Sequence, residues 1–172
     1  GISNGIIKKV GYLGGVQSET VIDASGLIVS PGFIDTHTHS DFTIWVDPNA
    51  DSSLRQGVTT QVIGNCGHSC APVRNENRNL LEKVIFGYVP GYPLEWETFG
   101  EYLDALQKKT VSHNIVSLVG HGAIRIACMG FNTKSPSPRD LEDMKTLVDQ
   151  AMSEGAFGLS TGLSYAPGSS AH

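Results

Sequence analysis

Cysteine is scarce in this chain, and its low number excludes one class of protein at once. The three cysteines among 172 residues, Cys66, Cys70 and Cys128, are too few and odd in number for a disulfide framework. The roles left to them are metal ligation and burial as small apolar side chains.

Positive charge and long apolar runs are also lacking. Seventeen acidic residues outnumber 12 basic ones, the formal net charge is -5, and no basic stripe is present, which disfavours nucleic acid as a partner. No apolar run has the length of a membrane span, and the first residues lack the pattern of a secretory signal. We therefore expect no membrane partner and a cytoplasmic location. The hydrophobic content of 40% is ordinary for a globular protein.

The first 30 residues carry the pattern of short strands. Apolar or β-branched stretches at residues 6–11, 20–23 and 27–29 are separated by glycine-containing turn signals. Three short strands are too few to bury a core. We therefore expect residues 1–30 to be part of a small β-sandwich domain whose other strands lie outside this chain.

From residue 31 onward, strands and helices alternate. Strands are predicted over residues 31–41, 58–63, 114–119 and 156–160, with helices over 51–56, 98–109 and 137–154 and a possible helix over 80–86. Thr98 and Glu101 form the sequence pattern of a capping box, and Ser137 precedes Pro138 as a helix N-cap.

This alternation predicts parallel strands in an α/β fold, either a barrel or an open sheet. Four strands make half of a (β/α)8 barrel. Because a half barrel leaves two long edges unpaired, we expect residues 31–172 to be the N-terminal half of a barrel in a longer protein.

The opening strand ends in two histidines, His37 and His39. Side chains alternate along a strand, so both imidazoles project to one face, together with Asp35 and Asp41 if the extended conformation continues. Two imidazoles on one face at the end of a strand can bind a divalent cation. Histidines that only make hydrogen bonds near a strand end are the alternative.

Cys66 follows the second strand, in the sequence Gly-Asn-Cys-Gly, at the same edge of the predicted sheet as His37 and His39. The glycines allow a sharp turn that could aim its thiol at the imidazoles. A thiolate is a strong zinc ligand, so these three residues are the candidate metal ligands. A compact zinc knuckle of Cys66, His68 and Cys70 is disfavoured because no second ligand pair follows it.

Three further residues are candidates for contact with a substrate or an anion. His121 ends the third strand and could contact a substrate or hydrogen-bond a neighbouring loop. Arg125 could bind an anion or form a surface salt bridge. Tyr165, beyond the fourth strand, could donate to a substrate carboxylate or pack at the rim.

The remaining cysteines and histidines are simplest as structural residues. Cys70 and Cys128 are interpreted as packing residues. His113, at the start of a strand, and His172, at the end of the chain, are interpreted as structural or solvated rather than ligating.

Five segments together resemble the N-acyl-D-amino-acid deacylases, or D-aminoacylases, of the amidohydrolase superfamily. They are residues 33–41, 57–60, 64–67, 119–122 and 158–163. The His-x-His pattern is shared across the superfamily, whereas the Asn-Cys-Gly loop narrows the resemblance to this branch. Hydantoinase-like and dihydroorotase-like relatives use a carboxylated lysine instead, and no lysine lies in or just after the fourth strand.

The resemblance implies a (β/α)8 barrel with zinc at its mouth and a small β-sandwich built from both chain ends. Cys66 would hold the tightly bound zinc with two histidines from later strands, and His37 and His39 would form part of a weaker site. Tyr165 would help to hold the substrate carboxylate. The general base would be an aspartate beyond His172, so we expect this chain to be inactive by itself.

The implied reaction is hydrolysis of an N-acyl-D-amino acid, a small-molecule substrate, to a carboxylate and a D-amino acid, with zinc as the cofactor. Two rival functions remain open. One is a cyclic-amide hydrolase of the hydantoinase or dihydroorotase type, and the other is a non-catalytic metal-binding barrel.

Overall fold

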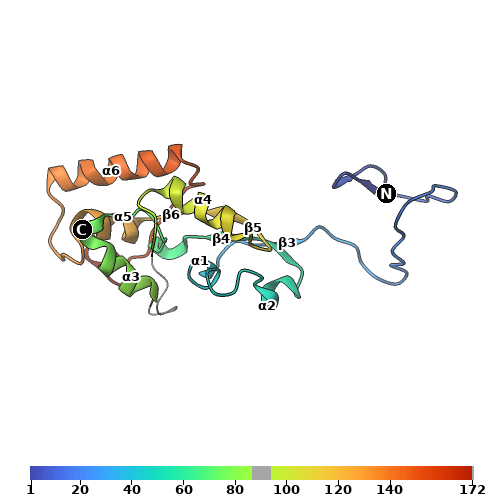
Figure 1. Ribbon diagram of the computed structural model, residues 1–172, viewed down its shortest axis with the longest axis horizontal. Helices are drawn as coiled ribbons and strands as arrows, with labels where there is room; N and C mark the ends of the chain where they lie inside the picture. Colours follow the sequence, from blue (N-terminus) through green and yellow to red (C-terminus); the bar gives the residue numbers. More distant parts are fainter. Residues whose placement is uncertain (87–93, 172) are drawn as a thin grey trace. The chain divides into compact units, whose positions relative to one another are not determined.

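The computed structural model describes residues 1–86 and 94–171, and the chain divides into two compact units, Gly1–Pro31 and Gly32–His172 (Figure 1). His172, for which the sequence predicts a structural or solvated role, lies outside the described residues. Every helix in the described part is too short or too polar to cross a membrane.

The first unit contains one small hairpin. Strands β1 (Ile2–Ser3) and β2 (Ile6–Ile7) pair in antiparallel fashion. The residues between them, Asn4 and Gly5, both have positive φ, at 51° and 71°. A two-residue hairpin turn of type I′ requires this conformation, and Asn-Gly is the sequence that adopts it most readily.

The other strands expected in the first unit are absent. The strand predicted over residues 6–11 ends at Ile7, and residues 20–23 and 27–29 form no strand. Val21 is 84% exposed and Ile28 is 96% exposed. Strand formation depends on hydrogen bonds to a neighbouring strand and on packing against its side chains. Apolar, β-branched sequence alone therefore does not produce the small sheet.

The second unit is built around parallel strands. Strands β3 (Phe33–Asp35), β4 (Val58–Ile63) and β5 (Asn114–Ser117) form one sheet in that order, and β6 (Val119–Gly120) pairs with β7 (Leu159–Ser160). The parallel strands predicted from the sequence are thus confirmed.

Strands β5 and β6 belong to one extended segment that changes its neighbour at Leu118. The Leu118 N–H donates to the carbonyl of Ile63 on β4, at 2.9 Å, whereas the Val119 N–H donates to the carbonyl of Gly158, just before β7, also at 2.9 Å. The four predicted strands therefore lie side by side in chain order. An open doubly wound sheet reverses its order partway, so this order favours a barrel.

The described helices alternate with these strands and largely follow the predicted positions. They are α1 (Ser40–Thr43), α2 (Asp51–Leu54), α3 (Arg78–Phe86), α4 (Phe99–Lys109), α5 (His121–Met129) and α6 (Pro138–Ser153), with 3-10 turns η1 (Asn65–Gly67), η2 (Asn75–Asn77) and η3 (Gly168–Ser170). Both predicted helix starts are confirmed, because capping boxes begin α4 at Thr98 and α6 at Ser137.

Helices α1 and α5 were not expected from the sequence. Helix α1 has four residues, too few for a periodic pattern. Helix α5 begins at His121, and the residues from Gly122 to Ala127 are all buried. A short, mostly apolar segment directly after a strand cannot be recognised as a helix from its periodicity alone.

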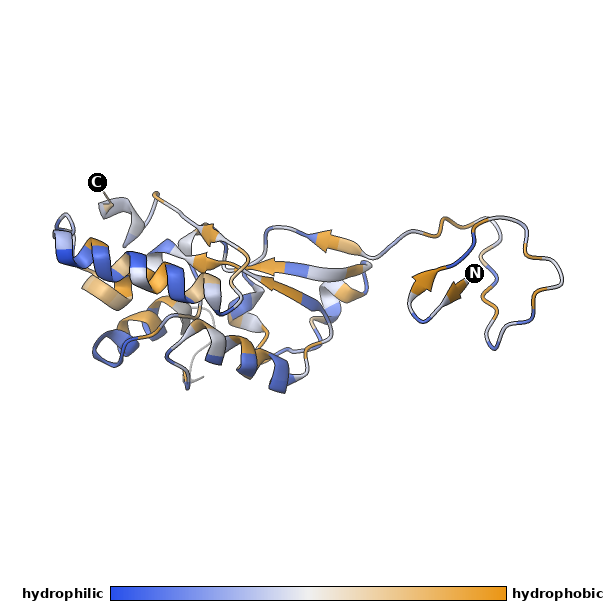
Figure 2. Cartoon of the chain, turned by 90° about the horizontal axis from the view of Figure 1, so that it is seen from above, coloured by the Kyte–Doolittle hydropathy of each residue, from blue (hydrophilic) through white to orange (hydrophobic). Residues whose placement is uncertain are grey.

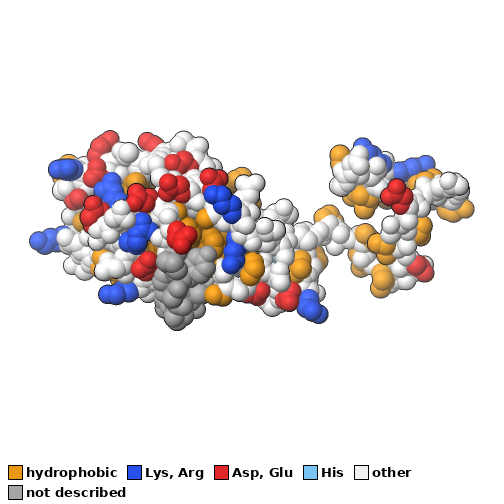
Figure 3. Space-filling view, viewed as in Figure 1, with side chains coloured by type: hydrophobic (Ala, Val, Ile, Leu, Met, Phe, Trp, Pro, Cys, Tyr) orange, Lys and Arg blue, Asp and Glu red, His pale blue; other side chains and the backbone are white. Residues whose placement is uncertain are grey.

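The core of the second unit lies between the sheet and the helices. Trp45 stacks on Trp96 with ring centroids 4.8 Å apart, and Tyr102 packs 5.2 Å from Trp96. Figure 2 shows helices with one hydrophobic and one hydrophilic side, as this packing requires. Acidic and basic side chains are interspersed on the face seen in Figure 3.

Candidate metal centre

His37 and His39 lie in a bend just after β3, and not on the strand itself. Strand β3 ends at Asp35, so the expected extended conformation stops before the histidines. The strand is also largely exposed, although its apolar residues favour burial: Phe33 is 59% exposed and Ile34 is 63% exposed.

The two imidazoles nevertheless come close together, with ring centroids 5.7 Å apart. Thr38, between them, fixes this bend on the neighbouring strand. Its N–H and its hydroxyl both donate to the carbonyl of Val62, each at 3.2 Å. The His37 N–H donates to a carboxylate oxygen of Asp35, at 3.2 Å. His37 and His39 are therefore close together as expected, but the bend after β3 brings them together and not the alternation of side chains along a strand.

Cys66 sits in a turn with an uncommon backbone conformation. Gly64, Cys66 and Gly67 all have positive φ, at 77°, 57° and 77°. Glycine adopts this conformation freely, whereas a residue with a β-carbon pays roughly 1–2 kcal/mol for it. The turn directs the Cys66 Sγ to 3.1 Å from the His37 Nε2.

The predicted ligands His37, His39 and Cys66 thus meet at one point. One ligand atom from each of the three residues lies within 4.8 Å of the other two. Among the described residues, this is the one group of three or more such side chains that could hold a metal ion. Two imidazole nitrogens and one thiolate are a donor set that suits zinc.

The electrostatic environment favours neutral imidazoles, which are the form that binds a metal. Burial lowers the pKa of His39, and the neighbouring His37 lowers it further. Burial also lowers the pKa of His68, with His39 as the second cause. Protons therefore compete less strongly with a cation for these nitrogens.

Asp41 does not share a face with His37 and His39, contrary to the sequence expectation. It belongs to α1 and is completely buried. Its Oδ1 accepts a hydrogen bond from the Gly64 N–H, at 2.8 Å. Burial raises the pKa of Asp41 to about 7, although the Gly64 N–H opposes this shift.

Tyr165 and His121 both lie beside the Cys66 turn. The Tyr165 hydroxyl donates to the Cys66 carbonyl at 2.6 Å, and its ring contacts His68 edge-on, with centroids 4.8 Å apart. The His121 Nδ1 is 3.2 Å from the Thr161 hydroxyl oxygen. The ring contact agrees with the rim-aromatic alternative for Tyr165, and donation to a substrate carboxylate stays a prediction.

The zinc knuckle alternative has no support in the structure. Cys70 is fully buried, and its thiol donates to the backbone carbonyl of Asp41, at 3.3 Å. Burial raises the pKa of the Cys70 thiol well above its usual value, which opposes formation of the thiolate that binds zinc. Cys70 is a packing residue, as expected.

Arg125 follows neither of its predicted roles. It is only 1% exposed, and its Nη2 donates to the carbonyls of Asn132 and Lys134, at 3.1 Å and 2.9 Å. It therefore anchors the turn after α5 and forms no surface salt bridge among the described residues. His113 is buried, and its Nε2 lies 3.2 Å from the Ser53 hydroxyl, in agreement with a structural role.

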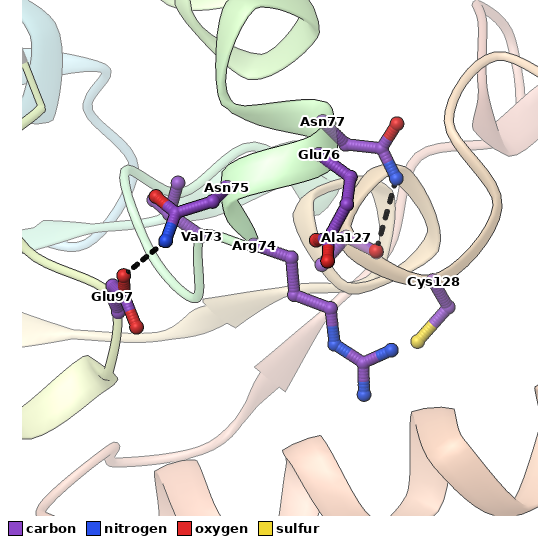
Figure 4. Close-up of a pocket in the computed structure, with 8 residues that line it drawn as sticks. All are labelled: Val73, Arg74, Asn75, Glu76, Asn77, Glu97, Ala127 and Cys128. Atoms are coloured by element: carbon purple, nitrogen blue, oxygen red, sulfur yellow. Dashed lines mark hydrogen bonds between the residues drawn. The ribbon is translucent and has the colours of Figure 1, made fainter.

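A cavity of about 460 Å³ elsewhere in the second unit shares no lining residue with the three candidate ligands. Figure 4 shows the Arg74 guanidinium and the Cys128 thiol directed toward it, with the Asn77 amide donating to the Ala127 carbonyl at 3.2 Å. Cys128 is half-buried, so it packs less completely than the sequence predicts. None of the candidate ligands lines this cavity, so we treat it as separate from the candidate site.

Sequence reasoning missed Ser160, which contacts the Cys66 turn from β7. Its hydroxyl oxygen accepts a hydrogen bond from the Gly67 N–H at 2.9 Å, and the same hydroxyl donates to the Gly64 carbonyl. The available signal was a polar residue at the carboxyl end of a strand, where barrel active sites lie.

A model of the amidohydrolase family matches residues 20–170 of this chain. The chain belongs to the amidohydrolase family. Within it, the sequence is 36% identical over 171 residues to D-aminoacylase from Alcaligenes xylosoxydans xylosoxydans, covering 97% of this chain and 34% of that protein. It is also 36% identical over 170 residues to N-acyl-D-aspartate deacylase from the same organism, covering 99% and 34%. The resemblance found in the sequence is confirmed.

Solved structures give the same result. A structure of N-acyl-D-glutamate deacylase from Bordetella bronchiseptica, complexed with zinc and a phosphonate mimic of the reaction's tetrahedral intermediate, has a TM-score of 0.82 and 35% identity. It matches 94% of this chain and 33% of that one. A D-aminoacylase with a binuclear metal centre has a TM-score of 0.71 and 35% identity, over 83% and 29%.

These matches confirm the α/β fold class and align the chain with part of a larger barrel of the amidohydrolase type. The chain spans about a third of the length of the curated relatives that it matches.

Proposed function

We propose that the whole protein hydrolyses the amide bond of N-acyl-D-amino acids, with zinc as its cofactor, and releases a carboxylate and a D-amino acid. One observation carries this proposal. His37, His39 and Cys66 converge within 4.8 Å in a chain that belongs to the amidohydrolase family. Relatives that match nearly all of this chain are deacylases of N-acyl-D-amino acids.

His37, His39 and Cys66 would hold the metal. The thiolate of Cys66 would bring the negative charge that two neutral imidazoles lack, and the lowered pKa of His39 keeps its imidazole neutral. When bound, zinc supplies a Lewis acid and lowers the pKa of a water molecule toward about 7.

Tyr165 and His121 would bind the substrate beside the ligands. Each presents a polar group at the carboxyl edge of the parallel strands, where barrel enzymes bind their substrates. The Tyr165 hydroxyl would exchange its bond to the Cys66 carbonyl for one to the substrate carboxylate. The general base would be an aspartate from the remainder of the whole protein.

Two expectations from the sequence stay predictions. One is that the first unit belongs to a small β-sandwich domain, and the other is a cytoplasmic location.

A paired-substrate assay on the whole protein tests the proposed function. N-acetyl-D- and N-acetyl-L-amino acids, matched in side chain, are supplied separately, and release of the free amine is measured with and without a chelator. We expect the D series to be hydrolysed preferentially and the chelator to abolish the reaction. Preferential hydrolysis of the L series, or of a cyclic amide tested beside them, would contradict the proposal.

A further inference from the structure

The conformation of Cys66 needs support from outside its own turn. Cys66 has a φ of 57°, and a residue with a β-carbon adopts this region reluctantly. The turn is short, since η1 covers only Asn65–Gly67. Its local hydrogen bond, from the His68 N–H to the Asn65 carbonyl at 2.9 Å, closes one turn but does not fix where the thiol points.

Ser160 closes this turn from a strand more than 90 residues away. Its single hydroxyl accepts from the Gly67 N–H at 2.9 Å and donates to the Gly64 carbonyl. These two groups flank Asn65 and Cys66. One side chain from β7 therefore fixes both ends of the backbone segment that carries the thiol.

Asp41, on helix α1, binds the same turn as Ser160 does. Its fully buried carboxylate accepts from the Gly64 N–H at 2.8 Å. Gly64 thus has its N–H bound to Asp41 and its carbonyl bound to Ser160. Asp41 also follows His39 by two residues, so it links the chain segment with the imidazoles to the turn with the thiol.

We propose that Ser160 and Asp41 are positioning residues for Cys66: they hold its left-handed turn so that the thiol meets the His37 imidazole at ligand distance. This inference rests on the proposed function, because it takes Cys66 to be a metal ligand. Neither residue contacts the metal or the substrate in this role. Asp41 acts through the Gly64 N–H, and Ser160 acts through the Gly64 carbonyl and the Gly67 N–H.

The test compares removal of each hydrogen bond with its retention. In the whole protein, Ser160→Ala and Asp41→Ala remove the acceptors, while Ser160→Thr and Asp41→Asn keep an oxygen that can accept from the same N–H groups. Zinc affinity is measured by competition with a chelator. We expect the alanine variants to bind zinc about 10- to 100-fold more weakly, which is the usual effect of losing a group that orients a ligand. The conservative variants should bind within about threefold of the parent.

A matched control serine is Ser153, whose hydroxyl donates only to the Gln150 carbonyl within α6 among the described contacts. Ser153→Ala should leave zinc affinity unchanged. Asp41 is fully buried, so we expect Asp41→Ala to reduce the yield of folded protein. Ser160, which is half-buried, then carries the test alone.

Two readouts distinguish positioning from general destabilisation. With Co²⁺ in place of zinc, Ser160→Ala should weaken the thiolate-to-metal charge-transfer absorption that reports a bound cysteine, and Ser160→Thr should restore it. In a Cys66→Ala background, Ser160→Ala should cause no further loss of affinity, because its effect passes through the thiol. Equal losses in both backgrounds would overturn the inference.

The two proposals fail in different ways. If Cys66→Ser keeps the parent zinc affinity and absorption, Cys66 is not a ligand and the proposed metal site fails. If Cys66→Ser loses them but Ser160→Ala does not, the metal site stands and only the positioning role is overturned.

Discussion

The Cys66 turn and the His37–His39 bend bring their side chains to the same point but are held very differently. Asn65 and Gly67 in the turn are buried, and three side chains from distant elements bind its backbone. In the bend, both imidazoles are exposed, and the contact with the neighbouring strand runs through Thr38. One candidate ligand is therefore held by more distant contacts than the other two.

This difference indicates a division of labour within one candidate site. A ligand that is already in place loses little conformational entropy on binding, so we expect the turn to set the position of a bound metal. The exposed imidazoles also have contacts, His37 with Cys66 and His39 with the Phe42 ring, but we expect them to adjust more readily than the buried turn if a metal binds. We therefore expect changes to the turn to have larger effects than changes to the bend.

The largest expected effect is that of Cys66→Ala in the whole protein. Removal of the fixed, charged ligand should weaken zinc binding by more than about 100-fold, so that the purified variant lacks stoichiometric zinc. The matched change in the bend, His37→Ala, should weaken it by only about 10-fold, since one neutral and adjustable ligand is lost. Metal content by elemental analysis and chelator competition measure both. Equal losses would remove the distinction between the two regions.

The next largest effect is expected from a substitution that displaces the Cys66 turn but leaves the three candidate ligands unchanged. Gly120 has an ordinary φ of -88°, but a methyl group at this position would collide with the Gly67 carbonyl. Gly120→Ala should therefore lower the free energy of unfolding by about 1–3 kcal/mol and weaken zinc binding as well. Chemical denaturation of the metal-free protein and chelator competition provide the two measurements.

Gly100→Ala is the matched control for that experiment. Its added methyl group would meet the Glu154 side chain at 3.4 Å, an ordinary contact distance. This variant should keep the parent affinity for zinc. A Gly120→Ala protein that also kept it would show that the turn tolerates displacement, contrary to the comparison above.

The smallest effect is expected far from both regions, at the start of α6. Ser137→Ala removes an N-cap and should lower the free energy of unfolding by about 1 kcal/mol without changing zinc affinity. Hydrogen bonds from Ser137 lower the pKa of Asp140 below its ordinary value of 3.8. The stabilisation by Asp140 is therefore present above that value and is lost as the pH falls through the lower folded-state pKa. Asp140→Asn should therefore have a lower free energy of unfolding than the parent at pH 7. Chemical denaturation at decreasing pH should show that this difference shrinks in acid.

Local sequence patterns predicted much of the second unit correctly. The capping boxes at Thr98 and Ser137 use groups within four residues of each other, so the sequence contains all of the information they need. Strand β4 was predicted because five of the six residues between Gly57 and Gly64 carry β-branched side chains.

Long-range contacts were the part that the sequence did not reveal. The bonds from Ser160 to the Cys66 turn span more than 90 residues, and no periodicity encodes them. Arg125 was expected at the surface because arginine usually lies there, but it is buried and its Nη2 donates to two carbonyls of the following turn. The strands at residues 20–23 and 27–29 failed for a related reason, since a strand needs a partner that local sequence cannot supply.

The change of strand partner at Leu118 limits where residues can be inserted into this chain or deleted from it. Before it, the segment follows β4, and after it, the segment follows β7. Because side chains alternate with a period of two, one inserted residue would reverse the facing of every residue on one side of that switch. Either Ser117 would leave the core or Gly120 would turn away from the Cys66 turn. We expect the segment between Ser117 and Gly120 to tolerate substitutions much better than the insertion or deletion of a residue.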